Sequence, residues 1–450
     1  MNDNDYFDAH CHIFTLNYAL KEVKNMLHDM LYGTYPWHSP TINNAKMLTM
    51  PDWSGIKDLL KQFYELISAS MGSEEENLNF LQSEALKAIP NIKWNITPLM
   101  MDIFYLLAYP LNKGENASQM RSAMTKHIDE NEFQKVWNEI LDDLKTHIRE
   151  RNSQLKITKN DTVKNVFEVI ESEKSIKKTF AFKSKTIESI GFYQTEGFCF
   201  HLNNLISLEK KRKGELFPFI AVDPRRPGMI DEIISGKYIS NNGPFYGVKL
   251  YPRMGYHPQS APMEALYNYC NDQKIPITFH CGKSGFPPSA KWKYADFENP
   301  VNFEPIIKRY PNLKINFAHL GSSDPTYNWA NTIINMVNQY DNVYSDLACY
   351  VDINDLEAAK VFWDNNPKLK SRLLFGTDFD VMYFTGEITM SSYYKNFKRI
   401  FSAHDLTLLM HDNPLRFFED ICKVSANNEN TFFSKVKSRK NKKELSKIKQ

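Results

Sequence analysis

The chain has 450 residues, a length that suits a barrel of about 250 residues with large insertions better than one small domain. Its formal net charge is +2, but residues 434–450 hold eight Lys or Arg and one Glu, which leaves −5 for the rest and disfavours wrapping of nucleic acid. The six cysteines form no CxxC pair, and neither a secretory leader nor a membrane-spanning apolar run is visible, so we expect a soluble, cytoplasmic protein with reduced thiols.

Eight short apolar runs end in polar or ionisable residues and alternate with helical patterns along the chain. This alternation is typical of parallel strands joined by helices, and eight such units close an α/β fold of the (β/α)₈ TIM-barrel type. Pro98 makes the second run the least regular, because proline cannot donate a hydrogen bond within a sheet. The predicted strands cover residues 6–12, 95–102, 216–223, 245–251, 275–280, 313–319, 343–346 and 372–378.

Two connections are far longer than a simple βα loop, and we expect helical insertions there, at about residues 17–92 and 104–195. Apolar residues recur at helical spacing between Ile56 and Ile67 in the first, and between Phe133 and Ile148 in the second. Because each insertion follows a strand, both should lie over the C-terminal face and cap the site; packing on the barrel flank or at a subunit interface is the alternative. We therefore predict one barrel domain over residues 1–433 and a basic, disordered tail over residues 434–450.

His10 and His12 stand two residues apart at the end of the first predicted strand. Residues i and i+2 of a strand point to the same face, whereas Cys11 between them points to the opposite face. Two imidazoles on the inner face of a barrel can both bind one metal ion at about 2.0–2.1 Å. The pair therefore predicts half of a metal site.

Three further strand ends carry residues of the same chemical type: His280 on the fifth, His319 on the sixth and Asp378 on the eighth. A single histidine at a strand end is commonly a core residue with a hydrogen-bond partner. Four of eight runs ending in this way indicate a shared site, because buried ionisable groups are costly unless they are paired or bind metal.

Six motifs of the chain resemble those of one known family. They are DAHCH, KLYP, ITFHCG, NFAHLG, FGTDF and HDNPLRFF, and together they are similar to the amidohydrolase-2 group of the amidohydrolase superfamily, which includes aminocarboxymuconate semialdehyde decarboxylase. The resemblance extends from Tyr6 to about Phe418 and omits both insertions. It implies a (β/α)₈ barrel with one divalent ion, expected to be zinc with manganese as the alternative, and a possible homodimer.

The resemblance also implies roles for individual residues. His319 would stand beside the ion as an acid, a base or an oxyanion stabiliser, and Asp378 would accept a proton from the attacking water. A bound zinc ion would bring the pKa of that water toward about 7. The implied metal ligands are His10, His12, His280 and Asp378.

Lys249 ends the fourth predicted strand and has three possible roles. It can face the substrate, be carboxylated and bridge a second ion, or be a buried lysine paired with Asp346 or Asp102. We favour a structural or substrate-facing role over the carboxylated bridge.

Other candidate contacts to a small, carboxylate-bearing substrate follow the fourth strand. Arg253 is the preferred one, together with Tyr251 and His257, because an arginine fork suits a carboxylate. Arg225 and Arg226, which follow the third strand, are either further carboxylate contacts or ordinary surface arginines.

We expect a metal-dependent hydrolase that uses an ion-activated water to cleave an amide, ester or lactone. A metal-dependent decarboxylase or hydratase on the same scaffold is the main alternative. A TatD-type nuclease would need a glutamate where Lys249 stands, and a catalytically silent barrel would not need a complete set of ligands. The expected partner is a small-molecule substrate, with no nucleic acid and no membrane.

Overall fold

The structure of the chain is a computed structural model. It describes residues 5–13, 15–31, 73–106, 108, 110–116, 130–155, 167–168, 170–171, 194–240, 243–282, 285, 294–322, 329–379 and 389–419. Within these residues, no helix has both the length and the apolar character needed to cross a membrane.

Eight strands are found among the described residues, and each overlaps one of the eight predicted runs. All of the strand pairs are parallel. The α/β class and the strand positions predicted from the sequence are therefore confirmed. The strands are β1(Asp5–Cys11), β2(Lys93–Pro98), β3(Phe219–Ala221), β4(Gly247–Leu250), β5(Ile277–Phe279), β6(Ile315–Phe317), β7(Val343–Asp346) and β8(Leu373–Leu374).

Hydrogen bonds connect the strands into a ring. Strands β1 and β2 form one pair, and β3 to β8 form a six-stranded sheet in chain order. The bridge between Leu99 and Phe219 joins the end of β2 to β3, and the Ala9 amide donates to the Phe375 carbonyl, 2.9 Å away, beside β8. The carboxyl ends of the strands consequently surround one space, as expected for a barrel.

Aromatic side chains fill the opposite end of this ring. Phe7 of β1 packs against Phe217 and Phe418, with ring centroids 5.7 and 5.8 Å away, and Phe219 of β3 packs against Phe417. Phe417 and Phe418 belong to the last described helix, α16(Asn413–Phe418). This apolar packing closes the amino-terminal end of the barrel, so the polar residues collect at the carboxyl end.

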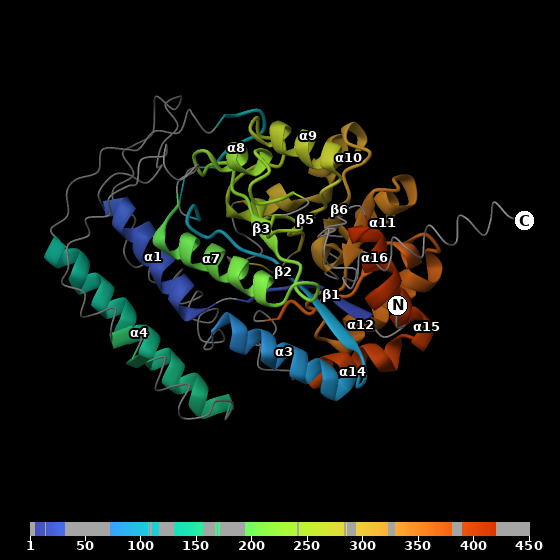
Figure 1. Cartoon of the computed structure of the whole chain (residues 1–450), viewed down its shortest axis with the longest axis horizontal. Coiled ribbons are helices and arrows are strands. Elements are labelled where there is room, and N and C mark those ends of the chain that lie inside the picture. Colours follow the sequence, from blue (N-terminus) through green and yellow to red (C-terminus); the bar gives the residue numbers. More distant parts are fainter. Residues whose placement is uncertain are drawn as a thin grey trace, which may run out of the picture.

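Helices follow the strands around the barrel and also form a layer on one side of it (Figure 1). The side layer contains α1(Leu16–Leu31) and α3(Glu74–Ala88) from the β1–β2 connection, and α4(Glu130–Leu155) and α7(Glu196–Lys211) from the β2–β3 connection. The other helices are α8(Met229–Ile234), α9(Met263–Gln273), α10(Glu304–Arg309), α11(Trp329–Gln339), α12(Ile353–Asn365), α14(Met390–Ile400) and α15(Ala403–Thr407), with the short 3₁₀ helices η2(Pro252–Met254), η3(Ala295–Glu298) and η5(Ala318–Gly321).

The α4 helix lies in the second long connection, where the spacing of apolar residues predicted a helix. Its buried stripe contains Trp137, Ile140, Leu144 and Ile148, as the spacing indicated. Figure 1 shows α4 outermost, with α1 and α7 between it and the strands. The helix predicted around Ile56 lies outside the described residues, as does the basic tail, and the bounds and capping role of the two insertions stay predictions.

A buried cluster of charged residues connects this helical layer to the barrel. It consists of Arg226, Asp102 and Glu22 and is here called the Arg226 clamp. Arg226 donates two hydrogen bonds of 2.7 Å to the Asp102 carboxylate, and its guanidinium lies 3.4 Å from Glu22 of α1. Arg225 pairs with Asp223 at 2.6 Å. Both arginines are thus buried and bound to carboxylates of the chain itself, rather than exposed at the surface.

Candidate metal centre

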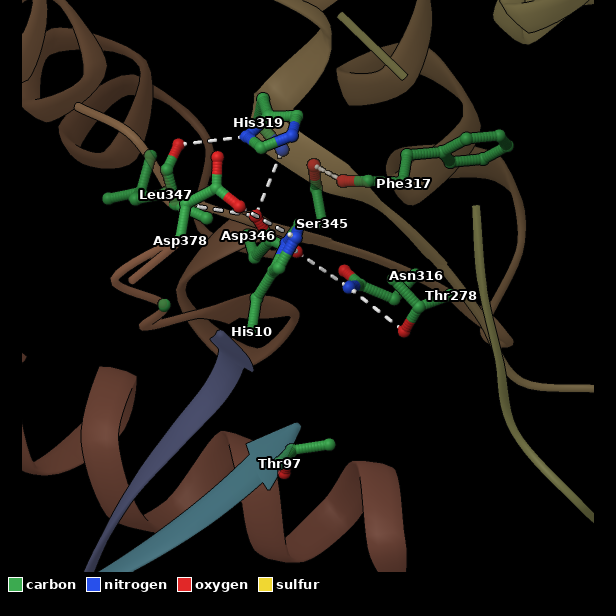
Figure 2. Close-up of polar contacts among 12 residues, drawn as sticks. His10, Thr97, Thr278, Asn316, Phe317, His319, Ser345, Asp346, Leu347 and Asp378 are labelled. Carbon is green, nitrogen blue, oxygen red and sulfur yellow. Dashed lines mark hydrogen bonds and ion pairs between the residues drawn. The ribbon is translucent and has the colours of Figure 1, made fainter. Parts of the chain in front are cut away.

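The polar residues predicted from the strand ends gather at the carboxyl end of the barrel, and Figure 2 shows His10, His319 and Asp378 among them. His10 lies in β1 and Lys249 in β4, whereas His280, His319 and Asp378 follow β5, β6 and β8. All five side chains are buried. The parallel strands thus bring together residues from the first and last parts of the chain.

Three ligand atoms converge most closely. Asp378 Oδ1 lies 3.4 Å from His10 Nε2 and 3.3 Å from His12 Nε2. Among the described residues, His10 Nε2 and Asp378 Oδ1 have no hydrogen-bond partner. Two atoms that each lie about 2.0–2.1 Å from one tetrahedral zinc ion are about 3.4 Å apart. The three donors therefore fit a shared divalent cation.

Backbone carbonyls fix the ring orientation of two histidines. His12 Nδ1 donates to the Leu99 carbonyl at 2.6 Å, and His319 Nδ1 donates to the Ala348 carbonyl at 3.0 Å. A carbonyl oxygen only accepts, so each Nδ1 must carry the proton. In the neutral ring, Nε2 then holds a free lone pair, which is the form that binds a metal ion.

Carboxylates hold the other two histidines. His10 Nδ1 lies 3.0 Å from Asp346 Oδ2, and His280 Nδ1 lies 2.5 Å from Glu298 Oε1. Carboxylate–histidine pairs of this kind commonly stand behind metal ligands, because the carboxylate orients the ring and makes its second nitrogen more basic. Neither Asp346 nor Glu298 was assigned to the site from the sequence.

Asp346, the last residue of β7, is the hub of these contacts (Figure 2). Its Oδ2 also accepts from Asn316 Nδ2 at 2.7 Å, and its Oδ1 accepts from the amides of His319 and Ala348 at 2.9 and 3.1 Å. Burial acts to raise the pKa of Asp346, but His10 and these hydrogen bonds hold it well below its usual range. Its position at a strand end is the one sequence signal that could have identified it.

Asp8 fixes the loop that carries Asp378. Its carboxylate accepts from the amides of His10 and Thr377 at 3.2 and 3.1 Å and from the Thr377 hydroxyl at 2.5 Å. Burial raises the pKa of Asp8 to about 7. Gly376 lets this loop approach β1 closely, since a Cβ there would lie 2.7 Å from His10 Cβ. Asp378 itself has a φ of +54°, which is strained for a residue other than glycine.

Burial tunes the charge state of the site. It lowers the pKa of His10 to about 4 and also lowers the pKa values of His12 and His280, so all three rings are neutral at pH 7. Burial acts to raise the pKa of Asp378, but the neighbouring histidines hold it well below its usual range. Neutral imidazoles beside an ionised carboxylate are the protonation states that metal binding requires.

His280 adjoins this group through His319. The His319 ring centroid lies 4.9 Å from that of His10 and 5.1 Å from that of His280. Among the described residues, the ligand atoms of His10, His12 and Asp378 all lie within 4.8 Å of one another, and His280 is not part of that compact set. Its role as a ligand stays a prediction.

The four predicted substrate contacts lie in different surroundings. Burial lowers the pKa of Lys249 to about 8, and its Nζ has no hydrogen-bond partner among the described residues. Tyr251 stacks on His280 with ring centroids 4.2 Å apart. Arg253 is completely buried and pairs with Glu298. His257 is half-buried, and its Nδ1 accepts from the Gln259 amide at 3.0 Å. The structure therefore places Lys249 and Tyr251 at the histidines and Arg253 behind them.

Three solved structures are similar to this chain. An uncharacterized TIM-barrel protein from Bordetella bronchiseptica is 18% identical over 49% of this chain and 72% of its own, with a TM-score of 0.38. A probable 2-pyrone-4,6-dicarboxylic acid hydrolase from Acinetobacter baumannii is 16% identical over 50% and 81%, with a TM-score of 0.38. The 5-carboxyvanillate decarboxylase LigW from Sphingomonas paucimobilis is 12% identical over 48% and 70%, with a TM-score of 0.36.

The family comparison is more definite. No curated protein matches the chain. Residues 191–419, just over half of the chain, match the model of the amidohydrolase family. This region contains His280, His319, Asp346 and Asp378 and ends where the described residues end, with His10 and His12 outside it. The chain therefore belongs to the amidohydrolase family.

Proposed function

We propose that the chain is a metal-dependent hydrolase that cleaves an amide, ester or lactone bond in a small, carboxylate-bearing substrate. The observation that carries this proposal is that Asp378 Oδ1 lies 3.4 Å from His10 Nε2 and 3.3 Å from His12 Nε2, with all three ligand atoms within 4.8 Å of one another. With His280, these residues would hold one divalent cation, zinc by the chemistry of a nitrogen-rich donor set and manganese as the alternative.

A divalent ion in such a site polarises a carbonyl and lowers the pKa of water toward about 7. The chain supplies the proton transfers. Asp378 accepts a proton from the attacking water and returns it to the leaving group. His319, with its Nδ1 proton held by the Ala348 carbonyl, presents Nε2 as a second base, and once Nε2 has taken up a proton it can act as an acid or stabilise developing negative charge.

Lys249 supports a substrate that carries a carboxylate. Its ammonium group is buried without a hydrogen-bond partner among the described residues, and a buried charge of this kind is costly until an anion pairs with it. Tyr251 lies beside it, with the Lys249 Nζ 5.9 Å from the ring centre. Substrate contacts from Arg253 and His257 stay predictions, as do a homodimer and a cytoplasmic location.

A lyase is the second candidate function. The same ion and the same Lys249 would hold a substrate carboxylate that is lost as carbon dioxide, and His319 or Asp378 would pass a proton taken from water to the carbon left behind. Carboxylation of Lys249 and a second ion are a variant of both functions, because its buried Nζ has no hydrogen-bond partner within the described part of the chain.

Product analysis separates these functions. The zinc-loaded and manganese-loaded proteins are assayed against two sets of substrates: lactones, esters and amides of carboxylic acids, and aromatic carboxylates. Acid release, which reports hydrolysis, and carbon dioxide release, which reports decarboxylation, are measured in parallel. We expect acid release. The Asp378→Asn variant should lose turnover by about 10²–10⁴-fold while its circular dichroism stays unchanged. Full activity of this variant would remove Asp378 from the mechanism.

A further inference from the structure

We propose that Glu298 is a positioning residue for His280 and that Arg253 holds Glu298 in place. The inference rests on the proposed function, because it assumes that His280 binds the ion. The sequence predicted a substrate contact for Arg253 and no role for Glu298. Glu298 lies in η3, 18 residues beyond His280 in the chain, and Arg253 lies in η2 after β4.

The contact between Glu298 and His280 is short and fully enclosed. His280 Nδ1 lies 2.5 Å from Glu298 Oε1, and the side-chain exposures are 5% for His280 and 0% for Glu298. With Nδ1 bound to the carboxylate, the other ring nitrogen, Nε2, is left for a metal ion. The pair repeats, with different residues, the contact of His10 Nδ1 with Asp346.

Arg253 contacts Glu298 on the side away from His280 Nδ1, at the second carboxylate oxygen. Its Nη1 lies 3.4 Å from Glu298 Oε2, both side chains have 0% exposure, and the Arg253 backbone also donates to the Glu298 carboxylate. Burial raises the pKa of Glu298 to about 8, and the positive charge of Arg253 acts in the opposite direction. Arg253 thus holds Glu298 at Oε2 while Glu298 Oε1 contacts His280 Nδ1.

The remaining sides of the His280 ring are also fixed. Tyr251, two residues before Arg253, stacks on one face with an interplanar angle of 27°. Gly285 approaches the ring edge so closely that a Cβ there would lie 2.6 Å from His280 Cε1 and 2.7 Å from the Tyr251 hydroxyl. The segment from Tyr251 to Arg253 therefore positions His280 twice, through the ring face and through Glu298.

Metal affinity distinguishes positioning from a purely structural ion pair. Zinc and manganese dissociation constants are measured by chelator competition for the full chain and for Glu298→Gln. We expect the dissociation constants to rise by about 10–100-fold in this variant. Glu357→Gln, an exposed change on α12, is the matched control and should bind like the wild type.

A second variant covers the case in which Glu298→Gln fails to fold because Arg253 is left without its carboxylate. The double variant Arg253→Met, Glu298→Gln removes both charges together, which is better tolerated than breaking a buried pair. The same loss of affinity is expected in the folded double variant. Nitrogen-15 NMR of histidine-labelled protein, with His280→Gln to assign the signal, should show the Nδ1–H form of His280 in the metal-bound wild type.

Wild-type affinity in a folded Glu298→Gln or double variant, or an Nε2–H form of His280 in the metal-bound wild type, would overturn the inference. Its failure is separable from failure of the proposed function. If His10→Ala, His12→Ala loses the ion while Glu298→Gln binds normally, only the positioning role is wrong. If His10→Ala, His12→Ala still binds the ion at full occupancy, the proposed metal site itself is wrong.

Discussion

The histidines of the site differ in the hydrogen-bond partner of their Nδ1 atoms. This difference determines which of these contacts a side-chain substitution can remove. His12 and His319 depend on backbone carbonyls, which no side-chain substitution can remove. His10 and His280 depend on the carboxylates of Asp346 and Glu298, which substitution can remove. Among residues that are not themselves metal ligands, substitutions of Asp346 and Glu298 should therefore weaken metal binding most strongly.

Asp346→Asn tests this for His10. An asparagine replaces one carboxylate oxygen of Asp346 by an NH2 group, which cannot accept a hydrogen bond. At least one of the four hydrogen bonds to Asp346 is therefore lost. We expect the free energy of unfolding of the metal-free protein to fall by about 1–3 kcal/mol in urea titrations. The zinc dissociation constant should rise by about 10–100-fold.

The matched control is Asp341→Asn, because Asp341 is 86% exposed and should tolerate the change. If Asp346→Asn matches this control in both measurements, Asp346 does not orient His10.

The sequence indicated the ligand-type residues but not their partners. His10, His280, His319 and Asp378 stand at strand ends, where a parallel barrel must bring them together. Asp346 also stands at a strand end, but no local pattern separates an orienting carboxylate from a ligand. Glu298 had no signal, because it reaches His280 from a 3₁₀ helix whose position depends on tertiary packing.

At the scale of elements, the Arg226 clamp determines how α1 meets the barrel. Glu22 of α1 lies 3.4 Å from Arg226, and it also accepts a hydrogen bond of 2.6 Å from Thr195, which precedes α7. Burial raises the pKa of Glu22 to about 7, with Arg226 acting in the opposite direction. The helical layer is consequently attached through a group that titrates near neutral pH.

The Glu22→Gln variant should make this titration visible. The folded protein holds a proton on Glu22 up to its raised pKa of about 7, whereas the unfolded chain releases it near the ordinary glutamate pKa of 4.5. The stabilising contribution is therefore complete below pH 4.5 and is lost as the pH rises through 7, by about 3 kcal/mol in total. Urea titrations at several pH values should show wild-type stability falling relative to Glu22→Gln over this window. A constant difference between the two proteins would contradict the assignment.

The Arg226 clamp also shows why the role of Arg225 and Arg226 could not be read from the sequence. Both follow β3 in a polar stretch that suits exposed residues or substrate contacts equally well. Their partners come from α1, from the end of β2 and from Asp223, so only the packed structure shows that both are buried.

At the scale of the whole molecule, the pattern of eight apolar runs was sufficient to predict the parallel strands, because a strand buried on both faces is apolar along its length. The α4 helix was also predictable from its spacing. The arrangement of the helical layer could not be predicted from the sequence. A helix with one apolar face has the same sequence pattern whether it packs on the side of the barrel or over its carboxyl end.

A bound ion should stabilise the whole barrel, because its ligands come from the first and last strands. Zinc at 100 times its dissociation constant is expected to add about 2.7 kcal/mol to the free energy of unfolding. Thermal unfolding with zinc and with a chelator should therefore give a higher Tm with zinc in the wild type. The His10→Ala, His12→Ala variant should show little response to zinc, and an equal response in both proteins would place the stabilising ion elsewhere.

The central claim is that His10, His12 and Asp378 share one ion, and metal content tests it most directly. Wild-type protein and the His10→Ala, His12→Ala variant are purified identically and analysed by elemental mass spectrometry, with the exposed His404→Ala as control. We expect about one zinc or manganese ion per chain in the wild type and the control, and almost none in the double variant. Stoichiometric metal in the double variant would contradict it.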